Sequence, residues 1–158
     1  MHLQKTLRAV SRTFAVSIER LPPVLREAVT ISYLLLRVSD CLEDNEDLAA
    51  EHKAELLRLW TEILSGEKPV GALTSQITHL DASDPEVYVA QNADELQAAL
   101  HQLPLETQEI INRHVIDSSL GMARWQEHGP VVNTEEEMDD YMYQVAGRVG
   151  HLLTDLFG

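Results

Sequence analysis

The hydrophobic pattern is clearest in the segment that begins at Val24, where it predicts a helix that is apolar on most sides. Its apolar positions recur at helical spacing: Val24, Leu25, Ala28, Val29, Ile31, Leu35, Val38 and Leu42. A helix with so wide an apolar surface has little area left for solvent, so we expect it to lie at the centre of the fold.

Further segments show the same spacing or carry residues that start and stop helices. Gly66 ends an amphipathic segment, and Asp84 with Pro85 starts a helix that must end before Pro104. The predicted helices are 2–9, 48–66, a short one within the loop 66–84, 84–103, 105–127 and about 135–157. No segment predicts a strand, a linker or an internal repeat. We therefore predict an all-α helical bundle that forms a single domain over residues 1–158.

Composition and charge narrow the classes of function. The chain has 158 residues, of which 44% are hydrophobic, and this is enough for a substantial core. Its 26 acidic residues outnumber 12 basic ones, which gives a net charge of −14. This charge excludes electrostatic capture of nucleic acid, and it would repel an anionic substrate unless metal cations lay between the two.

The single cysteine and the lengths of the apolar segments indicate in which cellular compartment we expect the protein. Cys41 has no second cysteine to pair with, so we expect no internal disulfide, an inert thiol on an apolar helix and a cytoplasmic location. The N-terminal sequence MHLQKTLRAV is short of apolar side chains and does not resemble a signal peptide. Arg37 breaks the longest apolar segment, which falls short of the roughly 18 residues of a membrane span. We expect a soluble protein, with peripheral membrane contact left open.

The stretch 35–44, LLRVSDCLED, ends the apolar helix in charged residues and forms the first candidate site. Arg37, Asp40 and Asp44 are spaced i, i+3 and i+7, so they share one helix face, with the two aspartates about 6 Å apart along the axis. Such carboxylates suit Mg²⁺, which takes oxygen ligands and often bridges to phosphates. The alternative is a solvated helix end, although acids there oppose the helix dipole. Glu43 either joins the pair or stays solvated.

Two other segments have a structural explanation beside a functional one. In YMYQVAGRVG, residues 141–150, Gly147 and Gly150 lie inside a predicted helix, where a glycine costs about 1 kcal/mol relative to alanine. Either a neighbouring helix packs closely there or a ligand chain crosses the glycines. In SRTF, residues 11–14, the serine and threonine are ordinary helix caps, but Arg12 offers phosphate a forked geometry that lysine lacks.

Taken together and in this order, these segments resemble the squalene and phytoene synthase family of head-to-head prenyl transferases. SRTF with the later LLRVSDCLED resembles the N-terminal signature of the family, SSLGMARW resembles a helix before its next motif, and YMYQVAGRVG resembles that motif. The resemblance covers nearly the whole chain, is weakest in the loop 66–84, and is closer to squalene synthases than to phytoene synthases. It implies a helical bundle of the isoprenoid synthase type.

The resemblance also implies roles for individual residues. Asp40 and Asp44 match the first aspartate-rich motif, which binds Mg²⁺ and through it a substrate diphosphate. Phe14 matches a pocket aromatic that steadies carbocations, and Tyr141 matches a tyrosine of the first half-reaction. The implied reaction joins two farnesyl diphosphates through a cyclopropyl intermediate, and squalene formation adds a reduction by NADPH. The diphosphate site matches Ser11, Arg12, Thr13 and Arg37, and the prenyl tunnel matches Val145, Ala146 and Gly150.

The family also has a second aspartate-rich motif on a later helix, and this chain shows no match to it, since Asp155 stands alone in LLTDLFG. We therefore expect an N-terminal portion with an incomplete bundle, inactive or weakly active alone. Two alternatives stay open: a non-catalytic protein that binds a prenyl diphosphate or a partner helix, and a phytoene- or dehydrosqualene-type synthase. An incomplete bundle exposes an apolar face, which leaves self-association open as well.

Overall fold

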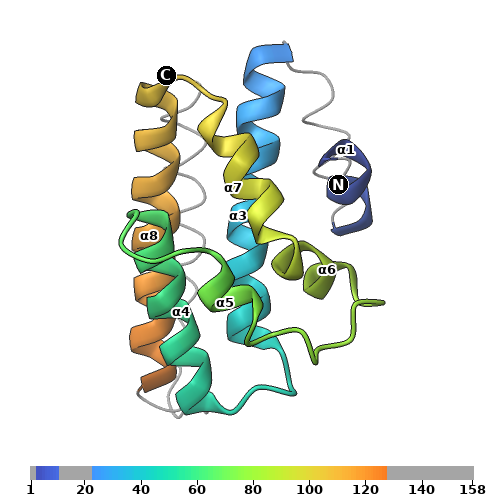
Figure 1. Cartoon of the computed structure of the whole chain (residues 1–158), viewed down its shortest axis with the longest axis vertical. Coiled ribbons are helices and arrows are strands. Elements are labelled where there is room, and N and C mark those ends of the chain that lie inside the picture. The colour runs from blue at the N-terminus through green and yellow to red at the C-terminus, as the bar shows by residue number, and fades with distance from the viewer. Residues whose placement is uncertain (1–2, 11–22, 128–158) are drawn as a thin grey trace, which may run out of the picture.

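The structure is a computed structural model that describes residues 3–10 and 23–127, and every regular element in these ranges is a helix (Figure 1). This confirms the predicted all-α class for the described part of the chain. In order, the helices are α1 (Leu3–Val10), α3 (Pro23–Asp44), α4 (Ala50–Leu64), α5 (Gly71–Thr74), α6 (Pro85–Gln91), α7 (Ala93–His101) and α8 (Leu105–Glu127).

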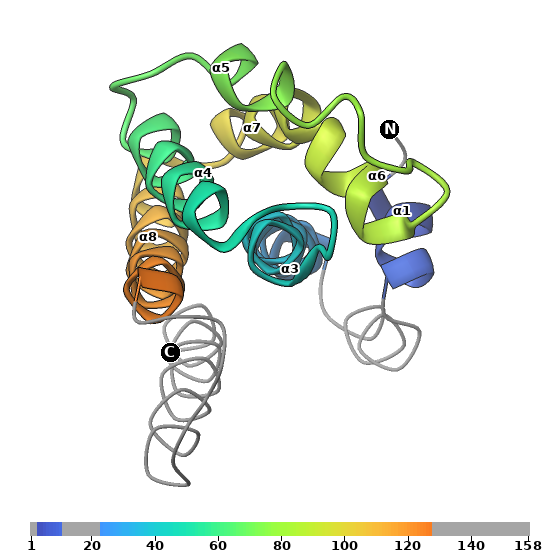
Figure 2. The same ribbon diagram turned by 90° about the horizontal axis from the view of Figure 1, so that it is seen from below.

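Helix α3 lies at the centre, as its apolar pattern predicts. It packs against α1, α4, α6, α7 and α8, and the view along its axis shows α4 and α8 on one side with α1 and α6 on the other (Figure 2). Because neighbours surround it, α3 needs apolar residues on several faces rather than along a single stripe. Its fully buried side chains include Ile31, Leu34, Leu35, Val38 and Leu42.

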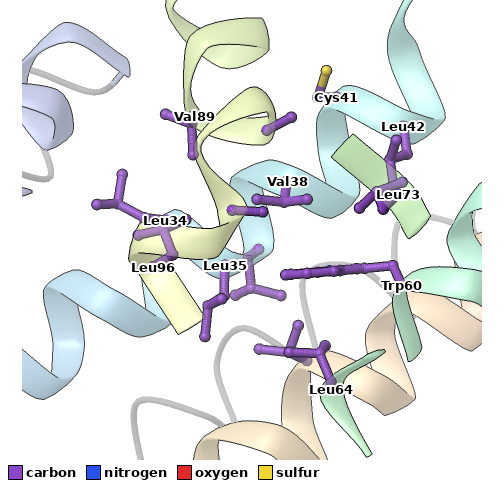
Figure 3. Packing of buried hydrophobic residues seen from close by; sticks show 14 of the residues in the cluster. Leu34, Leu35, Val38, Cys41, Leu42, Trp60, Leu64, Leu73, Val89 and Leu96 are labelled. Carbon is purple, nitrogen blue, oxygen red and sulfur yellow. The ribbon is translucent and has the colours of Figure 1, made fainter. Parts of the chain in front are cut away.

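The core between α3 and α4 centres on Trp60, whose side chain is fully buried. Figure 3 shows its ring reaching from α4 toward Leu35 and Val38 of α3. Full burial of a leucine- or phenylalanine-sized side chain contributes about 1.5–3 kcal/mol from the apolar area removed from water, and the larger ring of Trp60 contributes at least as much. Helix α4 also packs along α8, so Trp60 lies where three helices meet.

The loops confirm one predicted helix end and correct one predicted helix. Gly66 follows the C-cap of α4 and has a φ of 87°, a left-handed conformation that favours glycine. The predicted helix 84–103, in contrast, is wrong as a single element, because it divides into α6 and α7 at Asn92. The Asn92 side chain donates a hydrogen bond to the Tyr88 carbonyl over 2.8 Å, and such local bonds of asparagine compete with helix continuation.

The described helices also bear on membrane contact. None of the helices in residues 3–10 and 23–127 is long and apolar enough to cross a membrane. The predicted helix at about 135–157 lies outside the described residues.

Candidate functional site

The charged end of α3 carries the candidate site. Arg37, Asp40 and Asp44 all lie within the helix, so their spacing brings them to one face as predicted. The Arg37 and Asp40 side chains are each 28% exposed, whereas Asp44 is open to solvent. The face is therefore both partly buried and reachable by a ligand.

Arg37 is held by side chains on both sides of its guanidinium. Its Nη2 donates to the Tyr33 hydroxyl over 2.9 Å, and the guanidinium carbon lies 5.3 Å from the centroid of the Tyr33 ring. Its Nη1 lies 3.5 Å from Asp40 Oδ2 and 3.4 Å from Glu86 Oε1. The arginine thus bridges α3 and α6 at the edge of the aspartate pair.

Glu86 is the part of this cluster that the sequence analysis missed. It lies in the first turn of α6, where the side chain of Asp84 caps the helix by accepting from the Glu86 amide over 2.9 Å. In sequence, an acid in a first helical turn is explained by the helix dipole alone. Only the packing of α6 against α3 shows that this carboxylate meets Arg37.

The carboxylates of the site crowd one another. Burial, with the negative charges of Glu86 and Asp44, raises the pKa of Asp40 to about 7, although Arg37 acts against this rise. Burial likewise raises the pKa of Asp44, where Lys53 and Arg37 oppose the shift. Ionising both aspartates therefore costs free energy, because they are partly buried and repel each other, and a bound cation would reduce this cost.

Of the two alternatives left open for Glu43, the structure excludes the solvated one, because the residue is buried beside the pair. The residue is only 5% exposed, and its Oε2 has no hydrogen-bond partner among the described residues. Burial, together with Asp44 and Asp40, raises its pKa to about 8. It is a buried acid at the flank of the aspartate face on α3.

The donor chemistry of the site fits a hard divalent cation. Within residues 3–10 and 23–127, no group of three or more His, Cys, Asp and Glu side chains is arranged to hold a metal ion. Asp40 and Asp44 nevertheless offer carboxylate oxygens on one face, which is the number of protein carboxylates that Mg²⁺ commonly uses when a phosphate supplies further oxygens.

Cys41 plays no part in this chemistry. It is buried at 1% exposure, and burial with the neighbouring acids raises the pKa of its thiol to about 12. The remaining predicted site residues lie outside the described residues, so their roles stay predictions: Ser11, Arg12, Thr13, Phe14, Tyr141, Val145, Ala146 and Gly150.

Comparison with known proteins assigns the family. The sequence profile of squalene/phytoene synthase matches residues 7–158. The chain belongs to the squalene/phytoene synthase family. Its described part, with Arg37, Asp40 and Asp44 on the central helix, carries the segment that resembles the first aspartate-rich motif of this family.

Individual relatives of this family agree. The chain is 34% identical over 153 residues to squalene synthase BSS of Botryococcus braunii, and 32% identical over 165 residues to squalene synthase ERG9 of Saccharomyces cerevisiae. These alignments cover 96% and 99% of this chain but 31% and 35% of the relatives. The chain thus spans about a third of the length of the curated relatives it matches.

The fold also matches within this family. A solved structure of TcSQS in complex with the ligand BPH1237 superposes with a TM-score of 0.80 at 30% identity. The match covers 98% of this chain and 43% of the TcSQS chain. The chain therefore has the isoprenoid synthase fold of squalene synthases, as the resemblance predicted.

Proposed function

We propose that this chain carries the first diphosphate site of a squalene-synthase-like prenyltransferase, which condenses two farnesyl diphosphates head-to-head through a cyclopropyl diphosphate. The observation that carries the proposal is the Arg37 guanidinium beside Asp40 on the face that Asp44 shares. Release of a diphosphate requires positive charge beside the leaving group, and an arginine next to carboxylates that can hold a metal cation supplies it.

In this proposal Asp40 and Asp44 hold Mg²⁺, which when bound neutralises the charge of the departing diphosphate. Arg37 adds N–H donors in a planar fork, a geometry that suits phosphate oxygens. The stacking of Arg37 on Tyr33 keeps that fork oriented before the ligand arrives.

The proposal extends to residues outside the described ranges through their motif matches alone. Ser11, Arg12 and Thr13 complete the diphosphate site, and Phe14 and Tyr141 act on the reacting cations. The prenyl chain passes along Val145, Ala146 and Gly150. NADPH is the reductant if squalene is the product, and a phytoene- or dehydrosqualene-type product is the alternative for the same first steps.

The first test is Mg²⁺-dependent binding of inorganic diphosphate, and then of farnesyl diphosphate, by isothermal titration calorimetry. We expect the wild-type chain to bind both and Asp40→Asn to lose at least about tenfold in affinity, because a cation ligand is removed. Asp94→Asn is the matched control, since Asp94 is an exposed acid in the first turn of α7. Equal binding by Asp40→Asn and wild type would refute the proposal.

Product analysis distinguishes the remaining alternatives. Radiolabelled farnesyl diphosphate with Mg²⁺, with and without NADPH, separates squalene from dehydrosqualene by chromatography. Binding without any turnover by the chain would support a non-catalytic prenyl-diphosphate-binding protein. Sedimentation of the same sample tests self-association through an apolar face, and flotation with vesicles tests peripheral membrane contact.

A further inference from the structure

Arg37 is held from two different helices. Tyr33 and Asp40 belong to α3, at one turn before and one turn after the arginine, whereas Glu86 belongs to α6, 49 residues away in sequence. The Glu86 side chain is 24% exposed, so its carboxylate lies in the same half-buried environment as the groups it meets.

The two carboxylates share a single nitrogen of the guanidinium. Nη1 lies 3.5 Å from Asp40 Oδ2 and 3.4 Å from Glu86 Oε1. Charge-assisted N–H···O bonds usually close to about 2.7–2.9 Å. Nη1 therefore lies between the two carboxylates and forms a bond of this usual length with neither of them.

The open Arg37–Asp40 contact matters because the two residues are on one helix at i and i+3. Without an opposing charge, such a pair can close into a bidentate ion pair. A closed pair would engage the Asp40 oxygens that a cation needs and the Arg37 N–H groups that a phosphate needs. The carboxylate of Glu86 opposes that of Asp40 on Nη1.

Glu86 is also fixed in position. Its amide is bound by the capping Asp84 side chain, and Pro85 stands at the start of the helix. One and three residues further on, Val87 and Val89 are buried in the core, which anchors this turn of α6 on α3. The carboxylate is therefore presented from a rigid turn, as a positioning group requires.

We propose that Glu86 is a positioning residue that keeps the Arg37 guanidinium over Tyr33 and away from a closed pair with Asp40, so that both remain available to a cation and a diphosphate. The inference rests on the proposed function for the identity of the ligand. The positioning itself is a property of the unliganded chain and can be tested separately.

Crystal structures of the unliganded variants test the positioning. In Glu86→Ala we expect Arg37 to leave its present position and close onto Asp40 at about 2.8 Å, the usual length of a charge-assisted bond. In Glu86→Gln the amide oxygen can accept the same bond, so Arg37 should stay. Glu109→Ala, an exposed acid on α8, is the control for loss of one charge. An Arg37 that keeps its position in Glu86→Ala overturns the proposal.

Calorimetric titration with Mg²⁺ and inorganic diphosphate tests the consequence. Glu86→Ala should bind about tenfold more weakly than wild type, and Glu86→Gln within about threefold, because the lost interaction is a hydrogen bond to a charged group. In an Arg37→Ala background, Glu86→Ala should cause no further loss of diphosphate affinity. A purely structural role of Glu86 would still lower the affinity in that background.

The outcomes separate this inference from the proposed function. Glu86→Gln and Glu86→Ala could lose diphosphate affinity equally, and keep that loss in the Arg37→Ala background. This result would show that Glu86 acts only through its charge, and it would overturn the positioning role. A wild-type chain that binds no diphosphate, while Arg37 still moves in Glu86→Ala, would overturn the proposed function and support the positioning role.

Discussion

The hydroxyl oxygens of Ser39 and Ser119 lie 2.7 Å apart in the core and join α3 to α8. Ser119 also lies 2.7 Å from the Val115 carbonyl, which can only accept, so the Ser119 proton is directed there. Ser39 must then donate to Ser119, and it accepts from the Trp60 indole over 3.2 Å. One chain of hydrogen bonds thus links α4, α3 and α8 in a single direction.

Ser39→Ala should destabilise the fold by about 1–3 kcal/mol, because it leaves the buried Trp60 indole N–H and the Ser119 hydroxyl without this partner. Urea denaturation gives the change in the free energy of unfolding. Ser75→Ala, at an exposed serine, is the control and should change it by less than about 0.5 kcal/mol. A Ser39→Ala variant as stable as the control would show that this chain of hydrogen bonds does not stabilise the fold.

Leu35→Ala should cost about 2–5 kcal/mol, because Leu35 is fully buried at the contact of α3 with Trp60 and its removal leaves a cavity. The matched control is Leu105→Ala, since Leu105 is 76% exposed. Chemical denaturation of the two variants under the same conditions checks the difference. Similar losses in both would argue against a central α3.

Glu43 predicts a pH dependence of stability in the absence of Mg²⁺. Its pKa is about 8 in the folded chain against an ordinary 4.5, so between these values the folded state holds a proton that the unfolded state has lost. The free energy of unfolding should therefore fall as pH rises from about 5 to 8. Glu43→Gln should remove the part of this dependence that Glu43 contributes, leave the part due to the raised pKa of Asp40, and be more stable than wild type at pH 9 by on the order of 2 kcal/mol.

Denaturation with a metal chelator between pH 5 and pH 9 measures this effect. Glu109→Gln removes an exposed carboxylate instead and should follow the wild-type curve. A Glu43→Gln curve parallel to wild type across this range would show that Glu43 keeps an ordinary pKa.

Cys41 should be unreactive toward thiol reagents in the folded chain. Its pKa of about 12 leaves almost no thiolate at pH 8, and its side chain is buried. We expect labelling at least about a hundredfold slower than in guanidinium chloride, where the thiol recovers an ordinary pKa. Rapid labelling of the native chain would show that this end of α3 opens readily.

The sequence predicted those features that depend on residues near one another in the chain. Periodic apolar positions located α3 and its central place, and Gly66 located the end of α4. The division of residues 84–103 at Asn92 was missed because apolar spacing continues across that point and no Gly or Pro marks it.

In the candidate site, too, the sequence predicted the residues that lie near one another in the chain. Arg37, Asp40 and Asp44 were predicted together because one helix carries them. Glu86 was not, because its contact with Arg37 depends on how α6 packs against α3. The burial of Glu43 likewise depends on neighbouring elements, and no local pattern distinguishes it from a solvated acid.

The contact between Ser39 and Ser119 spans 80 residues, and this separation has a consequence during synthesis. At about 5–20 residues per second, the ribosome needs roughly 4–16 s to reach the second serine after the first. For that time the apolar faces of α3 lack the helix that closes them on the α8 side. The nascent chain then exposes apolar surface of the kind that chaperones protect from aggregation.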